Sequence, residues 1–299
     1  MRIVQDEIFL SSKAARYIFV LSFVLSHLLS ARAVAYERST TSEGVEANWF
    51  TRCIPIWLNQ VGSARISMIQ VEQDLASSIQ QWDSVACADL TMAYQGLTAS
   101  VDIGFDPTPD APNQNIVIFQ SVSGAWVHDS RAVGLTTVTM CQNDTPTCAA
   151  GTILDADIEL NEVDFTLTAS GTGNVQMDLA NTLTHELGHF LGLDHSDDTR
   201  ATMYAEAPLR ETKKRTIEAD DEAGACDLFP LGSARACLLT PFDLTSGVPT
   251  SNDEDITMQT STTASSCRQP TQQSGGVWLY LWGVVLLVIR SLKRARPTS

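Results

Sequence analysis

The stretch NTLTHELGHFLGLDHSDD, residues 181–198, places three histidines within eleven residues of a chain that contains only five. Two of them, His185 and His189, are four residues apart. On an α-helix, residues at this spacing project from the same face, so their imidazoles can bind one metal ion. Glu186 is rotated by about 100° around the helix axis from His185. Its carboxylate would therefore lie beside the metal, within reach of a water molecule there.

Gly192 follows His189 by three residues, and glycine favours the left-handed turn that ends a helix. The chain can then reverse and bring His195 to the same metal ion. Three protein ligands leave one coordination position open, which is typical of catalytic rather than structural zinc. We therefore predict one catalytic Zn²⁺ bound by His185, His189 and His195, with Glu186 as the general base.

The spacing of apolar residues predicts the elements around this segment. Apolar residues at steps of three and four between Met68 and Trp82 predict an amphipathic helix. Asp178 is a suitable N-cap for the histidine helix, and a later helix is expected over residues 218–228. Strands are predicted, from β-branched and aromatic content, at residues 53–60, 90–95, 115–120 and 133–140.

The segment GTILDADIELN, residues 151–161, alternates apolar and acidic side chains and predicts another strand. Ala156, Ile158 and Leu160 would face the core. Asp155, Asp157 and Glu159 would then form a solvated acidic face. Calcium binding by Asp155 or Asp157 is the alternative interpretation of these carboxylates.

The complete pattern H-E-x-x-H-x-x-G-x-x-H resembles that of the metzincin metallopeptidases. Within them the chain is most similar to the matrixins, because Ser196 directly follows the third histidine. The segment ATMYA is similar to the methionine turn of the family, in which Met203 would lie beneath the zinc. The segment IEADDEAGACDLF, residues 217–229, is similar to the closing helix of matrixins. The resemblance extends from Trp49 to Pro230.

The resemblance implies an α+β fold of the zincin type, with a twisted mixed five-stranded sheet, an active-site helix and a small C-terminal lobe. It implies a zinc-dependent endopeptidase that acts on a protein or peptide. It also implies that an extended substrate pairs with a strand at the edge of the cleft, formed by Asp155, Ala156, Asp157 and Ile158. A surface-anchored zinc-binding or adhesion protein without turnover is the alternative, although the intact Glu186 argues against it. An enzyme that hydrolyses a non-peptide amide is a third interpretation.

Both ends of the chain have the features of export signals. Residues 1–35 combine basic residues, a short apolar run and the small-x-small sequence Ala33-Val34-Ala35, which predicts a cleaved signal peptide. An uncleaved anchor is the alternative. Residues 275–299 contain a glycine pair, an apolar run and a basic cluster, and resemble the tripartite sorting tails of Gram-negative surface proteins. A plain membrane anchor is the alternative there.

Between these ends we predict three regions. These are a polar N-terminal extension at 36–48, the catalytic domain at 49–230 and a Ser/Thr-rich stalk at 231–274. The formal net charge of −16 argues against nucleic acid as a partner. We expect a monomer that is secreted or held at the cell surface, with membrane contact only through the tail.

Seven cysteines in an exported chain predict disulfides. Pairing of nearest neighbours gives Cys53–Cys87, Cys141–Cys148 and Cys226–Cys237, and leaves Cys267 unpaired. Six cysteines allow about fifteen pairings, so this assignment stays open. A disulfide at Cys53 is favoured over a role in blocking the zinc. Outside the leader the only further histidine is His128, so a second, structural zinc is not expected.

Overall fold

The computed structural model describes residues 35–108 and 111–239, which all belong to one compact unit. The predicted leader (except Ala35), most of the stalk, Cys267 and the sorting tail lie outside the described residues. Among the described residues, no helix is both long enough and apolar enough to cross a membrane.

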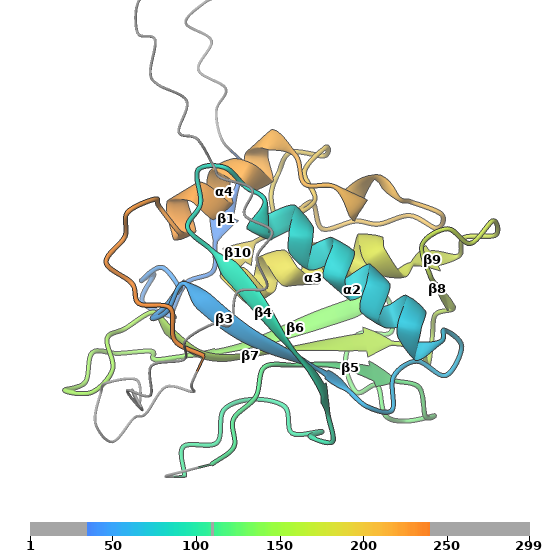
Figure 1. Ribbon diagram of the computed structural model, residues 1–299, viewed down its shortest axis with the longest axis horizontal. Helices are drawn as coiled ribbons and strands as arrows, with labels where there is room; N and C mark the ends of the chain where they lie inside the picture. Colours follow the sequence, from blue (N-terminus) through green and yellow to red (C-terminus); the bar gives the residue numbers. More distant parts are fainter. Residues whose placement is uncertain (1–34, 109–110, 240–299) are drawn as a thin grey trace, which may run out of the picture. The chain divides into compact units, whose positions relative to one another are not determined.

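The unit is built from one mixed sheet with two long helices on one of its faces and a short closing helix (Figure 1). The strands are β1 (Glu37–Arg38), β2 (Asn48–Trp49), β3 (Cys53–Asn59), β4 (Thr91–Thr98), β5 (Ile116–Gln120), β6 (Gly134–Met140), β7 (Thr152–Asn161), β8 (Leu167–Thr168), β9 (Met177–Asp178) and β10 (Leu193–Asp194). The helices are α2 (Met68–Asp83), α3 (Leu179–Leu191), the 3₁₀ turn η1 (Lys213–Arg215) and α4 (Ala219–Leu228).

The main sheet has the order β2-β7-β5-β3-β4, and β6 pairs with β7 on its other side. All neighbours are parallel except β6 and β7, which are antiparallel. The predicted α+β fold with a mixed sheet is therefore confirmed. The sheet has six strands and not five because the two-residue strand β2 adds to it.

Helix α2 buries the face that its apolar spacing predicts. Val71, Leu75 and Trp82 are at most 1% exposed, and each fully buried aliphatic side chain contributes about 1.5–3 kcal/mol. The indole of Trp82 also donates a hydrogen bond to the carbonyl oxygen of Thr184 on α3, at 3.0 Å. These contacts fix α3, which carries the histidines, against α2 and the sheet.

Strand β7 contradicts the prediction of a solvated acidic face. Its apolar face packs against the helices as expected, but Asp155, Asp157 and Glu159 are also no more than 5% exposed. The segment between β4 and β5 covers this second face, where the N–H of Gly104 donates to Asp157 Oδ2 at 2.6 Å. Calcium binding by Asp155 or Asp157 stays a prediction.

Strand β7 is also not the edge of the sheet. β6 pairs with Ile153–Leu160 of β7 on one side. On the other side β2 pairs with Thr152 and Ile153, β5 pairs with Ile158–Asn161, and the Ala156 amide between them donates to Asn115 Oδ1. The prediction that Asp155, Ala156, Asp157 and Ile158 form the cleft-edge strand is therefore wrong. Among the described residues β4, which pairs only with β3, is one edge strand of the sheet, and β6, which pairs only with β7, is another. The seven residues of β6 are all partly exposed.

The segment 36–48, predicted as an extension outside the domain, is part of the fold. β1 pairs with β10, and β2 pairs with β7. Ala47 is fully buried, and the indole of Trp49 donates to the carbonyl oxygen of Phe190 at 2.9 Å. The amide of Ala35 donates to Asp220 Oδ1 at 2.6 Å. The N-terminal segment therefore links the sheet to α3 and α4.

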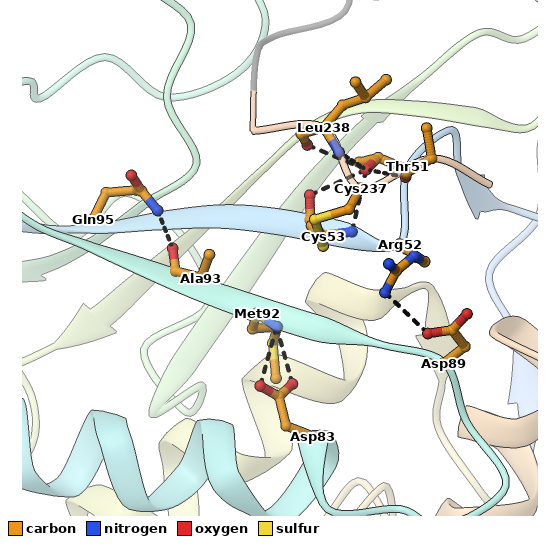
Figure 2. Close-up of a disulfide and its surroundings, with 11 residues drawn as sticks. Thr51, Arg52, Cys53, Asp83, Asp89, Met92, Ala93, Gln95, Cys237 and Leu238 are labelled. Atoms are coloured by element: carbon orange, nitrogen blue, oxygen red, sulfur yellow. Dashed lines mark hydrogen bonds and ion pairs between the residues drawn. A yellow bond between two sulfur atoms is a disulfide. The ribbon is translucent and has the colours of Figure 1, made fainter. Parts of the chain in front are cut away.

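The fold also continues past the predicted boundary at Pro230. Cys237 forms a disulfide with Cys53 at the start of β3, as Figure 2 shows. Thr51 Oγ1 lies 2.9 Å from the carbonyl oxygen of Ala236, to which it donates, and it accepts a hydrogen bond from the Leu238 amide. The disulfide and these hydrogen bonds therefore hold the C-terminal part of residues 231–239 against the start of β3.

Two of the three predicted disulfide pairings are wrong. The structure contains Cys53–Cys237, Cys87–Cys226 and Cys141–Cys148, so only the last pairing was predicted. Pairing of nearest neighbours failed because the fold brings distant segments together. Cys87 precedes Ala88, which forms a β-bridge with Pro230 just after α4. Because Cys53 is disulfide-bonded, its thiol cannot block a zinc site.

Candidate active site

Helix α3 begins and ends where the sequence predicts. The Asp178 carboxylate caps the helix by accepting the Asn181 amide at 2.9 Å. Asp178 also pairs with the guanidinium of Arg215 from η1. At the other end Gly192 has φ of +110°, a left-handed conformation that few other residues adopt without strain. This turn sends the chain back toward the helix, into β10.

The turn after α3 brings the three histidines together. One side-chain nitrogen from each of His185, His189 and His195 lies within 4.8 Å of the others. The Nδ1 of His185 lies 2.7 Å from the carbonyl oxygen of Thr202, and the Nδ1 of His189 lies 2.9 Å from that of Leu193. Because a carbonyl oxygen only accepts hydrogen bonds, both Nδ1 atoms carry hydrogen. Both Nε2 atoms therefore present lone pairs.

The donor set fits a zinc ion. Nitrogens held about 2.0–2.1 Å from a tetrahedral zinc would be about 3.3 Å apart. The Nε2 atoms of His189 and His195 are separated by 3.2 Å. Burial lowers the pKa of all three histidines, so their imidazoles are neutral, as metal ligands must be. Hydrogen bonds from Nδ1 to backbone carbonyls fix the orientation of two of the rings.

Glu186 lies beside the histidines, and residues of strand β6 contact its carboxylate. Its side chain is only 5% exposed, and burial raises its pKa to about 7. Thr136 Oγ1 donates to Glu186 Oε2 at 2.8 Å, which opposes part of that rise. Gly134 lies so close that a Cβ there would be 2.7 Å from Glu186 Oε1. Glycine at residue 134 and threonine at residue 136 thus fix the carboxylate.

Met203 lies fully buried beneath this group, as the resemblance implies. The fully buried carboxylate of Asp221, on α4, accepts the amides of Thr202 and Met203 at 2.8 and 2.9 Å. The carbonyl of Thr202 in turn orients His185. Asp221 therefore supports one of the histidines through the backbone of the turn.

A cleft of roughly 790 Å³ opens in front of the histidines, within the size range of small-ligand and peptide sites. The edge strand β6 supplies one wall, and α3 supplies His185 and Glu186. Residues 205–208, which follow the methionine turn, and Lys214 of η1 also contribute to the lining. The cleft therefore runs along an unpaired strand edge and past the histidines.

Comparison with protein families places residues 57–230 in the family described as Matrixin. This match covers more than half of the chain, and the histidine geometry agrees with it. The chain belongs to the matrixin family. It is therefore a member of a family of metallopeptidases, and the zinc implied by that family suits the three histidines.

Two plant proteins are similar to part of the chain. The metalloendoproteinase 1-MMP of Arabidopsis thaliana is 44% identical over 59 residues, which are 20% of this chain and 16% of the relative. The metalloendoproteinase 1 of Glycine max is 46% identical over 52 residues, which are 17% of each protein. The chain thus matches about a sixth of the length of these relatives.

The sequence identified the three histidines that the structure brings together, but not several of the residues around them. Gly134 and Thr136 lie in a strand that was predicted only from its β-branched content. No local signal linked them to Glu186, some fifty residues away along the chain. The segment 204–215 was expected to form a wall of the pocket, but Lys214 was not singled out within it, because its position depends on how η1 packs on α3.

Proposed function

We propose that the protein is a zinc-dependent endopeptidase that uses Glu186 as its general base. The observation that supports this most strongly is the arrangement of Glu186 beside three neutral histidines at the wall of a cleft. Hydrogen bonds orient His185, His189 and the carboxylate of Glu186. A zinc ion bound by the histidines would supply Lewis acidity toward a water molecule and a substrate carbonyl.

Glu186 is suited to move the proton in this reaction. Its raised pKa of about 7 lets the carboxylate accept a proton from the attacking water and later return it to the leaving amine. Thr136 holds Oε2, so the carboxylate is aligned before substrate binds. This support argues for turnover rather than for a binding protein, which has no need of an aligned base.

An extended substrate would bind along β6. No strand of the described residues pairs with the outer side of β6, so its backbone groups there can form main-chain hydrogen bonds with a peptide. β6 contributes five residues, between Gly134 and Met140, to the lining of the cleft. Recognition through the backbone would place a peptide carbonyl at the histidines with little dependence on sequence.

We also propose that the protein is exported. The leader-like residues 1–35 and the sorting-like tail at 275–299 support this, as do three disulfides, which persist mainly in oxidising compartments. Removal of the tail during sorting would release the protein, whereas retention would keep it at the membrane.

The proposal is tested with the oxidised full chain. Metal analysis should find one zinc per chain, and the protein should cleave an unstructured protein such as casein. A chelator should abolish cleavage, and added Zn²⁺ should restore it. One bound zinc without cleavage of any tested protein would support the zinc-binding alternative, and absence of zinc would refute the site.

A further inference from the structure

Lys214 is a buried lysine in the wall of the cleft. It lies in η1, where its amide donates to Asn181 Oδ1 of α3 at 2.8 Å. The residue is only 1% exposed, yet it lines the cleft together with His185 and Glu186. The packing of η1 on α3 therefore brings an ammonium group close to the site of the proposed reaction.

This ammonium is incompletely partnered. Of its three N–H groups, one donates to the carbonyl oxygen of Tyr204. Among the described residues, no carboxylate lies within 4.0 Å of its Nζ, whereas the neighbouring Lys213 pairs with Glu211. Burial lowers the pKa of Lys214 to about 8, and more distant carboxylates oppose the change. A buried cation without an ion pair is costly, so it favours an anionic partner.

The lining of the cleft combines apolar side chains with several uncharged polar ones and the exposed Glu206. From β6 the lining includes Leu135, Val138 and Met140, and the segment after the methionine turn adds Ala207 and Pro208. Arg131 also borders the cleft, but it is exposed and paired with Asp129. A substrate side chain that enters would therefore meet apolar and uncharged polar side chains, and one buried cation whose side chain makes a single hydrogen bond among the described residues.

We infer that Lys214 determines specificity, and that the protein preferentially cleaves peptides in which a glutamate or aspartate next to the scissile bond enters the cleft. This inference rests on the proposed peptidase function. The substrate carboxylate would supply the missing anion and accept charge-assisted hydrogen bonds from Nζ. Hydrogen bonds of this kind correspond to a preference of about ten- to hundredfold over a matched apolar residue.

The preference can be measured with zinc-loaded full chain and two sets of synthetic peptides. One set varies the residue directly before the scissile bond, and the other varies the residue directly after it. The varied residue is Glu, Gln, Leu or Lys. In one set, kcat/KM should be at least tenfold higher for Glu than for Gln or Leu. Equal or faster cleavage of the Gln and Leu peptides in both sets by the unaltered protein would overturn the inference.

Variants separate a direct role of Lys214 from a structural one. Lys214→Met should reverse the preference to Leu, whereas Lys214→Arg should keep it because the cation remains. Lys213→Met is the matched control, since Lys213 does not line the cleft, and it should leave the Glu-to-Leu ratio unchanged. A merely structural role would lower kcat/KM for all peptides without changing this ratio.

A binding measurement distinguishes failure of this inference from failure of the proposed function. The dissociation constants of the same peptides are measured by calorimetry with zinc-loaded Glu186→Ala protein. Tighter binding of the Glu peptide, without hydrolysis by the unaltered protein, would support Lys214 and refute the peptidase. Hydrolysis without acidic preference, or binding that does not discriminate among the peptides, would refute the role of Lys214.

Discussion

Gly188 of α3 lies directly against the sulfur of Met203. A Cβ at residue 188 would be 2.1 Å from Sδ of Met203 and 3.0 Å from the ring of Trp82. An isolated helix would gain about 1 kcal/mol from alanine in place of glycine. The glycine between the two histidines of α3 is therefore explained by packing and not by helix propensity.

Gly188→Ala should destabilise the protein despite its higher helix propensity. Overpacking costs about 1–3 kcal/mol, and a contact of 2.1 Å favours the upper part of this range. After the gain in helix propensity we expect a net loss of about 1–2 kcal/mol in the free energy of unfolding by urea. Zinc affinity should also fall, because Met203 adjoins the residue whose carbonyl orients His185. Gly173→Ala is the control, since open space surrounds Gly173. A variant at residue 188 that is as stable as the unaltered protein would contradict the packing argument.

Asp221→Asn should weaken zinc binding although Asp221 contacts no histidine. Its carboxylate accepts the amides of Thr202, Met203 and Glu218. An asparagine would direct an NH₂ group at some of these donors and displace the turn. Loss of hydrogen bonds that orient the metal ligands typically lowers metal affinity about 10–100-fold. Competition with a chromophoric chelator measures this change, and Asp227→Asn, at an exposed acid of the same helix, should leave affinity unchanged.

The buried pair Asp155 and Asp157 should make stability depend on pH. Burial, and next the charge of Asp157, raise the pKa of Asp155 to about 9, above its value of about 4 in the unfolded chain. Between these values the folded state holds a proton that the unfolded state releases. This contribution to stability is therefore complete below about pH 4, and is lost as the pH rises toward 9.

Asp155→Asn removes this titration and keeps a group that can donate to Asp157. Between pH 6 and 9, the melting temperature of the variant should fall less than that of the unaltered protein. Asp102→Asn, at an exposed acid, should show the unaltered slope. If the melting temperatures of the Asp155→Asn variant and the unaltered protein fall in parallel between pH 6 and 9, Asp155 is ionised throughout this range, and the prediction is wrong.

Removal of the Cys53–Cys237 disulfide should destabilise the protein more than removal of Cys141–Cys148. The first joins residues 184 apart and the second joins residues 7 apart. Disulfides that close long loops restrict the unfolded chain more, with typical contributions of about 2–4 kcal/mol. Paired Cys→Ser variants and urea unfolding measure the order. Limited proteolysis should also cut residues 231–239 only when Cys237 is replaced.

The sequence predicts those parts of the site that depend on local geometry. Helix periodicity places His185 and His189 on one face, and Asp178 and Gly192 act as the predicted cap and turn. The alternation in β7 correctly predicts its apolar face. It cannot reveal that another segment covers the acidic face, because a covered and a solvated carboxylate have the same spacing along the chain.

The parts that were missed depend on contacts between distant segments. Edge and interior strands differ in their neighbours rather than in their own residues, so β6 was not recognised as an edge strand. The disulfide between Cys53 and Cys237 likewise depends on the path of the C-terminal segment across the sheet. Lys214 became a candidate only when the packing of η1 on α3 placed it in the cleft.

The most direct test of the central claim compares Glu186→Gln with the unaltered protein at equal zinc content. The substitution keeps the size of the side chain but removes its ability to accept the proton. We predict one zinc per chain in both proteins and a fall in kcat/KM of about 10²–10⁴-fold in the variant. Activity within a few-fold of the unaltered protein, with zinc bound, would contradict the role of Glu186 as the general base.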